Sequence, residues 1–355
     1  MSINNNIKIT YENIKPKNYR DFKIGIIGAG NIIENSHLPI YVKEDLNIVN
    51  IFDEDLNKAK KLKKKFNINK YSLNLNEFLN DNNIDIVDIA VPAEFNKDLF
   101  IKTLKKGKNI LIQKPLANNI KAAKEILKHY NKSNLKANVN HQMRYSPSIM
   151  AAKNILKKKM IGQVMEFNFY THRFTNWSIW PWLQNIDYPE LRYNSIHYLD
   201  SIRYLFGNPK TIKAKLIHSD NDILNKPTNI KVNFIYEKFS GVLHITHNSK
   251  LQSNKWKAGF KIIGDLGECT GTISSMIGNG KDFYDKIKFS YLKNKILYKH
   301  EDKLNGRWFS ESFNGPIFSL MKSINNNTQP ETNIYDAFET LLLVEEVIRS
   351  HELNE

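Results

Sequence analysis

The feature that most constrains this chain is a glycine turn that follows a short apolar run near the N-terminus. Residues 23–33 read KIGIIGAGNII. The apolar run suits a strand buried on both faces of a parallel sheet. Gly28 permits a tight turn, and Gly30 lets the backbone approach a pyrophosphate held at the start of the following helix. Because Ile33 stands where the pattern G-x-G-x-x-G has its third glycine, the turn alone is equally consistent with an ordinary strand-turn-helix unit.

An acidic residue at the end of the next apolar run makes the turn more specific. Asp53 follows the run 48–52 and lies 20 residues beyond Ile33. A carboxylate at the tip of a second parallel strand is placed to accept hydrogen bonds from both hydroxyls of an adenosine ribose. Two further acids follow it, and the next basic residue is Lys58, so a 2′-phosphate would meet negative charge. The sequence therefore predicts dinucleotide binding, with NAD favoured over NADP.

Apolar and helical segments alternate regularly through the first part of the chain. This order predicts an α/β fold, a doubly wound parallel sheet of the Rossmann type with right-handed crossovers. Ligands of such sheets bind beyond the carboxyl ends of the strands, which places 91–92, 113–115 and 140–142 at the ligand edge. The strands are expected at 22–27, 47–52, 84–91, 108–113 and 136–140, and the helices near 32–43, 54–66, 75–81, 95–106 and 118–132.

The pattern changes beyond residue 147. A helix at 149–159 leads into segments that alternate polar with apolar residues, as strands with one covered face do. Two more helices are expected at 195–206 and 334–351. We therefore predict an α+β domain built on an open, mostly antiparallel sheet, with strands at 163–173, 210–218, 229–239, 241–249, 258–266 and 285–293.

Composition restricts the class of protein. The chain has 355 residues, of which 41% are hydrophobic, and its apolar runs are shorter than a membrane helix. The N-terminus lacks the pattern of a signal peptide, and Cys269 is the only cysteine, so a cytoplasmic location without disulfides is expected. The net charge of +16 comes from lysines spread along the chain, which favours solvated surfaces over nucleic-acid or membrane binding. Steering of an anionic ligand is the alternative role for the densest cluster, Lys58–Lys65.

The ordered motifs resemble those of the Gfo/Idh/MocA oxidoreductases, which include glucose-fructose oxidoreductase and inositol dehydrogenase. The resemblance extends over nearly the whole chain from about residue 21. It implies an N-terminal NAD-binding domain, a C-terminal open sheet through which a homodimer or homotetramer forms, and a last helix that returns to the first domain. The matching segments are 28–32, Asp53, 113–115, 141–147, 195–200 and 344–350, and the segment 307–309 matches a subset of the family.

The resemblance also implies domain limits and a reaction. Residues 1–20 are expected to form a tail, 21–146 the Rossmann domain, 147–330 the substrate and oligomerisation domain, and 331–355 the returning helix. Most members of the family transfer a hydride between the nicotinamide and a secondary alcohol of a sugar, sugar acid or polyol. The expected partner is thus a small carbohydrate.

Three residues are expected to take part in catalysis. Lys114 matches the family's lysine, and repulsion by an oxidised nicotinamide together with partial burial would lower its pKa toward that of a useful base. His197 matches a histidine that serves as acid or base. Tyr193 stands where the family often has an aspartate, four residues before that histidine, and Gln113 replaces the usual glutamate. These two changes leave a non-catalytic, NAD-binding regulatory protein as an alternative.

The predicted site residues form two further groups. An aromatic cluster around Trp177 is expected either to lie under a sugar ring or to anchor a boundary. Arg173 and Arg192 flank it and are candidates for binding a carboxylate or phosphate. No metal site is expected. We assign to the cofactor Gly28, Gly30, Asn31, Ile32, Asp53, Val91, Pro92, Asn96, Gln113 and Lys114, and to the substrate Gln142, Arg144, Trp180, Trp182, Tyr193 and His197.

Two other enzyme activities remain open from the sequence. A sugar-nucleotide dehydrogenase would use additional basic residues to hold a diphosphate. An NAD-assisted glycosidase would cleave a glycosidic bond with no net formation of NADH.

Overall fold

A computed structural model describes residues 2–3, 14–218, 224, 226–248, 256–275 and 284–353. The chain divides into two units, and each is considered separately. The parallel-sheet unit contains the described part of residues 13–142 together with 313–341. The antiparallel-sheet unit contains the described parts of 1–12, 143–312 and 342–355. The predicted pairing of a Rossmann-type domain with a mostly antiparallel α+β domain is confirmed.

All six strands of the parallel-sheet unit run in the same direction, in the order β4-β3-β2-β5-β6-β7. The strand order reverses between β2 and β5, which is where open α/β sheets bind ligands. The strands are β2 (Lys23–Ile27), β3 (Asn47–Phe52), β4 (Lys70–Tyr71), β5 (Ile86–Ile89), β6 (Asn109–Gln113) and β7 (Ala137–Asn140).

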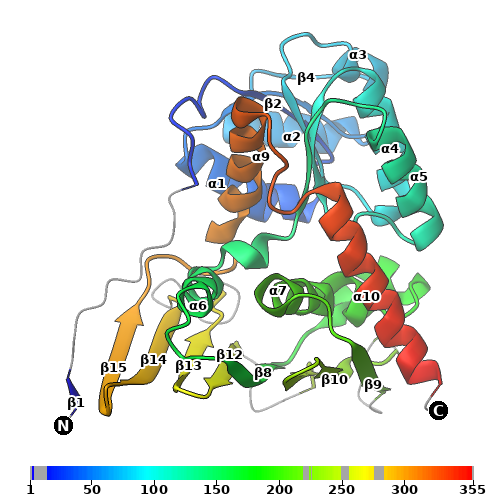
Figure 1. Ribbon diagram of the computed structural model, residues 1–355. Helices are drawn as coiled ribbons and strands as arrows, with labels where there is room; N and C mark the ends of the chain where they lie inside the picture. Colours follow the sequence, from blue (N-terminus) through cyan, green and yellow to red (C-terminus); the bar gives the residue numbers. More distant parts are fainter. Residues whose placement is uncertain are drawn as a thin grey trace. The chain divides into compact units, whose positions relative to one another are not determined.

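Helices cover both faces of this sheet (Figure 1). One apolar core contains side chains from α1 (Leu38–Lys43), α2 (Leu56–Phe66) and α9 (Asn314–Asn326). The other contains side chains from α3 (Leu75–Leu79), α4 (Ala93–Lys105), α5 (Ile120–Tyr130) and the first part of α10 (Ile334–Glu352).

The antiparallel-sheet unit is built on nine strands in the order β1-β15-β14-β13-β12-β8-β11-β10-β9. Neighbouring strands are antiparallel except for the pairs β8·β11 and β1·β15. The strands are β1 (Ser2–Ile3), β8 (Val164–His172), β9 (Thr211–Ile217), β10 (Asn229–Ile235), β11 (Ser240–Thr246), β12 (Lys257–Gly264), β13 (Gly267–Thr272), β14 (Lys286–Lys293) and β15 (Ile296–Lys303).

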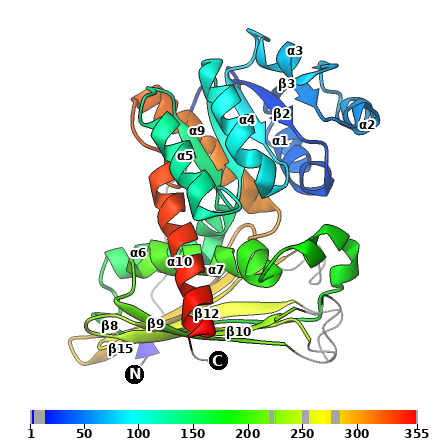
Figure 2. The ribbon, with the colours of Figure 1, turned by 90° about the vertical axis from the view of Figure 1, so that its right-hand side faces the viewer.

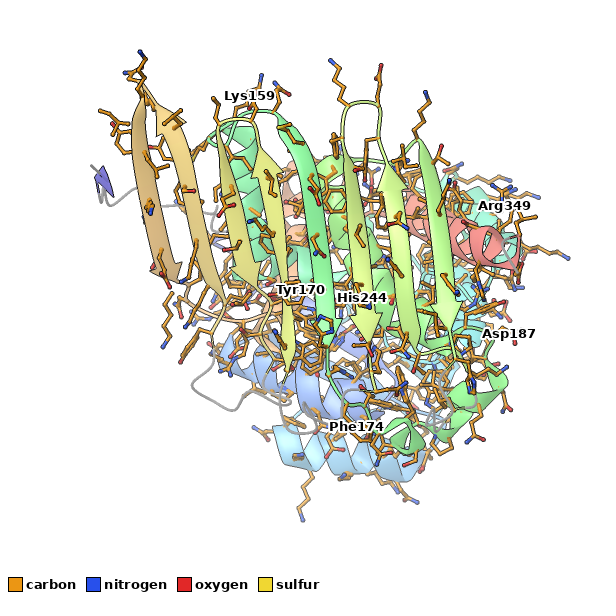
Figure 3. All side chains as sticks on the ribbon, turned by 90° about the horizontal axis from the view of Figure 1, so that it is seen from below. Lys159, Tyr170, Phe174, Asp187, His244 and Arg349 are labelled. Atoms are coloured by element: carbon orange, nitrogen blue, oxygen red, sulfur yellow. The ribbon has the colours of Figure 1, made fainter. Side chains whose placement is uncertain are left out.

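Two helices, α6 (Pro147–Lys157) and α7 (Ile196–Phe206), pack on one face of this sheet (Figure 2). Alternation along the strands sends buried aromatic rings such as Phe167 and Phe169 to the covered face. Tyr170 and His244 lie on the opposite face, which Figure 3 views directly. Short helical segments complete the unit at η2 (Gln142–Tyr145), η3 (Trp177–Ile179), η4 (Pro181–Asn185), η5 (Leu191–Ser195) and η7 (Glu311–Phe313).

The structure differs from the sequence prediction in the grouping of the residues from 313 onward. Residues 313–330, expected in the substrate domain, contribute α9 to the parallel-sheet unit, because its apolar side chains complete that unit's core. Helix α10 belongs to both units: Ile334 and Leu341 enter one core, while Val344 and Val347 enter the other. Residues 2–3 of the expected tail form β1, and 4–13 lie outside the described residues, as does residue 249 at the end of one expected strand.

No helix in the part of the chain that the structure describes has both the length and the apolar character needed to span a membrane.

Candidate functional site

The glycine turn connects β2 to a helix that begins at Asn31 and includes a π-helical segment, η1 (Ile33–His37). Gly28 has φ +104°, and a Cβ added there would overlap the carbonyl oxygen of Ala90, so both conformation and space require glycine. Gly30 is different, because a Cβ added there would meet no atom within 4 Å. The fold therefore leaves Gly30 and Asn31 exposed beside open space, as a phosphate group held at the turn would require.

Asp53 follows β3 and contacts the glycine turn directly. Its Oδ2 accepts a hydrogen bond from the backbone N–H of Ala29 at 2.7 Å, and its Oδ1 accepts one from the N–H of Asp55 at 2.8 Å. The side chain is only partly buried. A carboxylate oxygen can accept more than one hydrogen bond, so this arrangement fixes the carboxylate while leaving it able to accept from a ribose.

The loop that carries Lys114 is held from one side by Asn96 on α4. The Asn96 side chain is buried and its Nδ2 donates to the carbonyl of Pro115 at 2.9 Å, with longer contacts to those of Gln113 and Leu116. The structure thus shows Asn96 supporting the loop, and its assignment as a cofactor contact stays a prediction. The other predicted cofactor residues on this side, Val91 and Pro92, follow β5, and Pro92 precedes the first turn of α4.

Gln113 belongs to a buried polar network that the sequence analysis did not predict. His37 is fully buried, and its Nδ1 lies 2.6 Å from Oδ2 of Asp88. Its Nε2 lies 2.6 Å from Nε2 of Gln113 and 3.2 Å from Nδ2 of Asn140. The hydroxyl of Tyr41 donates to the same Asp88 oxygen at 2.8 Å. The sequence signal for this network was His37 itself, a polar residue on an otherwise apolar face of the helix that follows the glycine turn.

Lys114 lies directly after β6, and burial lowers the pKa of its ammonium to about 8. Its backbone N–H donates to Oε1 of Gln113 at 3.2 Å, and its peptide bond to Pro115 is cis. A lysine with a pKa near 8 exchanges a proton readily at neutral pH, which is the property required of a general base. The glycine turn, Asp53 and Lys114 thus all follow the carboxyl ends of strands in one parallel sheet.

His197 lies on α7 of the antiparallel-sheet unit and is buried. Its ring packs edge-on against the indole of Trp308, with ring centroids 5.4 Å apart, and Trp308 in turn packs against Trp256 at 5.3 Å. Trp308 lies in the segment 307–309 that resembles a subset of the family, and Trp256 was not among the predicted site residues. Neither residue lies near α7 in the sequence, so no local pattern connects these indoles to His197.

The predicted aromatic wall forms a small separate cluster. Trp177 is buried with Leu183 and Leu224, and Trp180 and Tyr193 pack against them. Trp182 is 41% exposed and meets the ring of Tyr193 at 5.0 Å. Tyr193 itself lies in η5, a π-helical segment, so the four residues from Tyr193 to His197 do not form a regular α-helical turn.

Arg144 has a structural partner, and its assignment to the substrate stays a prediction. Its guanidinium forms a buried, bidentate ion pair with Asp200 on α7, at 2.7 and 2.6 Å. A buried pair of this geometry satisfies both charges and ties η2 to α7. Gln142 of the parallel-sheet unit is also buried, and its Oε1 accepts no hydrogen bond from the described residues.

Comparison with known proteins agrees with the description of the parallel-sheet unit. Residues 22–141 match the GFO_IDH_MocA family, described as an oxidoreductase family with an NAD-binding Rossmann fold. An uncharacterized protein of Saccharomyces cerevisiae is 36% identical over 156 residues, which is 43% of each chain. The trans-1,2-dihydrobenzene-1,2-diol dehydrogenase of Xenopus tropicalis is 31% identical over 147 residues, 40% of this chain and 44% of that protein. The chain thus matches about two fifths of the length of these relatives.

Solved structures share the fold over nearly the whole chain. A levoglucosan dehydrogenase in complex with NADH and L-sorbose has a TM-score of 0.80 at 17% identity and covers 93% of this chain and 96% of its own. An oxidoreductase from Agrobacterium radiobacter, in complex with NAD⁺, L-tartaric acid and magnesium, has a TM-score of 0.81 at 18% identity and covers 94% and 97%. With its glycine turn and parallel sheet, the segment 22–141 of this chain thus matches the GFO_IDH_MocA oxidoreductase family with its NAD-binding Rossmann fold.

Proposed function

We propose that this protein is an NAD-dependent dehydrogenase that acts on a secondary alcohol of a sugar, sugar acid or polyol. The observation that carries the proposal is the placement of the glycine turn, Asp53 and Lys114 along the carboxyl edge of one parallel sheet. Two proteins of similar structure, a levoglucosan dehydrogenase in complex with NADH and L-sorbose and an oxidoreductase in complex with NAD⁺ and L-tartaric acid, support the class of substrate.

Each residue has a defined role in this proposal. The nicotinamide, when bound, accepts or returns the hydride. Lys114, whose pKa burial lowers to about 8, takes the proton of the reacting hydroxyl. His197 serves as the acid–base group of the antiparallel-sheet unit. Gly30 and Asn31 hold the pyrophosphate through their backbone, and Asp53 accepts hydrogen bonds from the ribose hydroxyls, which favours NAD over NADP.

The activity is tested by replacing Lys114 with alanine and following NADH formation on a panel of sugars, sugar acids and polyols. We expect kcat to fall by about 10²–10⁴, the usual contribution of a positioned base, with the Kd for NAD nearly unchanged. Lys121→Ala, an exposed lysine on α5, is the matched control and should keep full activity. A wild-type protein that binds NAD but oxidises none of the panel would instead support the non-catalytic alternative.

The cofactor preference has its own measurement. Asp53→Ala should weaken NAD binding and reduce the ratio of the NADP and NAD dissociation constants, because the negative charge that repels a 2′-phosphate is removed. Calorimetric titration of both nucleotides gives the ratio. Equal affinity of the wild type for NAD and NADP would contradict the preference.

We also propose that copies of the chain associate through the outer face of the nine-stranded sheet. Tyr170 and His244 lie on this face (Figure 3), and the ring of His172 packs between them, with ring centroids 5.8 Å from Tyr170 and 5.5 Å from His244. Burial, with His244 and Lys257 nearby, lowers the pKa of His172, so its ring is neutral at pH 7. Light scattering of wild type and His244→Glu tests this, and a wild-type monomer at micromolar concentration would contradict it.

A further inference from the structure

Arg173 lies just past the end of β8 in the antiparallel-sheet unit. Strands β8 and β11 pair in parallel, so their carboxyl ends lie side by side. The pairing continues beyond them, since the N–H of Arg173 donates to the carbonyl of Thr246 and that of Thr175 to the carbonyl of His247, both at 3.0 Å. Figure 3 shows the next residue, Phe174, beyond the strand ends. By the alternation along β8, the Arg173 side chain is on the face that α7 covers.

The guanidinium of Arg173 is held but has no carboxylate partner among the described residues. Its Nε donates to Oγ1 of Thr175 at 2.6 Å, and its plane packs over the indole of Trp256 at 4.3 Å. Burial lowers the pKa of Arg173 to about 10, so the group stays charged at neutral pH. A partly desolvated guanidinium with free terminal N–H groups is suited to bind an anion.

A hydrogen-bonded network fixes the position of this guanidinium. Oγ1 of Thr175 also lies 2.7 Å from Nδ1 of His247, whose Nε2 lies 2.9 Å from Oε1 of Glu190. The other oxygen of Glu190 accepts from Oγ of Ser195 at 2.5 Å. The charge of Glu190 is therefore satisfied by these donors, and its carboxylate does not pair with Arg173.

Arg192, the second arginine predicted from the sequence to bind an anion, has partners within the protein. Both of its terminal nitrogens contact the carboxylate of Glu345 on α10, and its Nε donates to the carbonyl of Asp187 at 3.1 Å. The structure thus distinguishes two arginines that the sequence left equivalent.

A row of indoles connects Arg173 to His197. Trp256, beneath the guanidinium, packs against Trp308, and Trp308 packs against His197. The indole Nε1 of Trp308 is buried and donates to no acceptor among the described residues. A buried N–H without a partner is rare in native proteins, and a bound ligand is one of the ways in which it is satisfied.

We propose that this row binds a substrate that carries a carboxylate as well as hydroxyl groups, with Arg173 on the carboxylate and the Trp308 N–H on a hydroxyl oxygen. This narrows the substrate class of the proposed dehydrogenase to sugar acids and related hydroxy acids, and it rests on that proposed function. A carboxylate fits better than a phosphate dianion, because one guanidinium balances one charge and the neighbouring Glu190 would repel a second.

The test compares binding of matched acids and neutral compounds to the full chain loaded with NADH. The pairs are D-glucuronate with D-glucose, D-galacturonate with D-galactose, and D-gluconate with D-glucitol, measured by titration calorimetry. We expect the wild type to bind at least one acid about tenfold or more tightly than its neutral partner, as a hydrogen bond to a charged group provides. Arg173→Met should remove this preference, and Arg173→Lys should retain part of it.

Two further variants separate this role from a loss of folding. Trp308→Phe keeps the ring and removes the N–H, so it should weaken both members of a pair equally. Arg192→Met should keep the preference of the wild type. Bound NADH shows that each variant is folded. The proposal is overturned if no acid binds more tightly than its neutral partner, or if Arg173→Met keeps the preference.

Turnover is measured separately from binding, by NADH absorbance. Acid-specific binding that depends on Arg173 but leads to no hydride transfer would support this site and contradict the dehydrogenase. Equal turnover of acids and neutral compounds would support the dehydrogenase and contradict this site.

Discussion

At the residue scale, the two glycines of the turn have different physical reasons to be glycine. Gly28 is required by the fold, through its positive φ and the nearby Ala90 carbonyl. Gly30 has open space where a side chain would go, so the fold itself does not require it. The sequence pattern marks both positions and cannot separate them, because only the surroundings in space differ.

This difference gives a pair of predictions about one turn. Gly30→Ala should leave the melting temperature within about 2 °C of the wild type, since it creates no overlap, and should weaken NAD binding at least fivefold. Gly28→Ala should lower the free energy of unfolding by about 1–3 kcal/mol, the cost of a strained backbone position. Differential scanning fluorimetry and NAD titration of the two variants provide the measurements. A Gly30→Ala protein with unchanged NAD affinity would contradict the role of that residue.

Gln113, which departs from the family's glutamate, is matched to the protonation state of His37. The N–H of Lys114 donates to Oε1 of Gln113, which turns the amide Nε2 toward Nε2 of His37. An amide nitrogen only donates, so Nε2 of His37 accepts and the imidazole proton is on Nδ1, facing Asp88. The Gln113 amide therefore sets the tautomer of His37.

Restoring a glutamate at this position should make stability depend on pH. In Gln113→Glu, a carboxylate would face the lone pair of His37, so the folded state must retain a proton on one of the two groups. Because only the folded state requires this proton, stability is lost as pH rises. We expect the free energy of unfolding of Gln113→Glu, relative to wild type, to fall by about 1–3 kcal/mol between pH 5 and pH 9. Denaturant titrations measure it, with Asn118→Asp in the same loop as control. An equal loss at both pH values would contradict the tautomer assignment.

At the element scale, one buried carboxylate connects the start of α6 to the sheet. Oδ2 of Asp285 accepts from Oγ of Ser146 and from the N–H and Oγ of Ser148 at 3.2 and 3.0 Å, and Oδ1 accepts from the N–H of Ser274 at 2.7 Å. Burial raises the pKa of Asp285 to about 6, and the hydrogen bonds oppose this only in part. The helix is therefore anchored by a group that ionises close to neutral pH.

The sign of the resulting pH dependence follows from the raised pKa. Between about pH 4 and pH 6 the folded state binds the proton more tightly than the unfolded state, so this group's contribution to stability decreases as pH rises. The free energy of unfolding of wild type minus that of Asp285→Asn should thus fall by roughly 2 kcal/mol from pH 4 to pH 7. Urea titrations at both pH values measure the difference. Asp302→Asn, on exposed β15, should show no such change, and an increase for Asp285→Asn would contradict the raised pKa.

Two strands that were not predicted from the sequence, β13 and β15, share a physical reason. Strand β15 is exposed along most of its length, and β13 contains glycines and threonines in place of alternating apolar residues. Neither has the pattern that marks a half-buried strand, because each is specified by pairing with its neighbours. The buried parallel strands were predictable for the opposite reason, since their side chains are apolar on both faces. Burial of Arg144 with Asp200 was not predictable, because the two residues lie far apart in the sequence.

At the scale of the whole molecule, the chain leaves the parallel-sheet unit after residue 142 and returns to it at 313. Its return adds four fully or nearly fully buried side chains of α9 to one core, and three of α10 to the other. They are Ile317, Phe318, Leu320 and Met321, and Ile334, Ala337 and Leu341. The glycine turn therefore depends on a sheet whose covering is supplied by residues far along the chain.

This dependence predicts the behaviour of fragments. Residues 14–142 alone should lack a cooperative thermal transition and should bind a hydrophobic dye, since the apolar surface under α9 is exposed. The same fragment joined to residues 313–341 by a flexible linker should regain a cooperative transition and NAD binding. Circular dichroism and dye fluorescence measure both. A cooperative transition of the short fragment, at the temperature of the linked one, would contradict the role of the returning segment.

The interrupted unit also has a consequence for synthesis. A ribosome adds about 5–20 residues per second, so about 9 to 35 seconds pass between the last residue of β7 and the first of α9. During that interval the nascent parallel sheet has its strands, glycine turn and most helices, but both of its faces still lack side chains that α9 and α10 supply. Strands β8 to β15 of the antiparallel sheet are made in that interval, so the covering of the first sheet is completed only after the second sheet has been made. A chaperone that covers the exposed apolar surface of the parallel sheet would act in this interval, before any cofactor can bind.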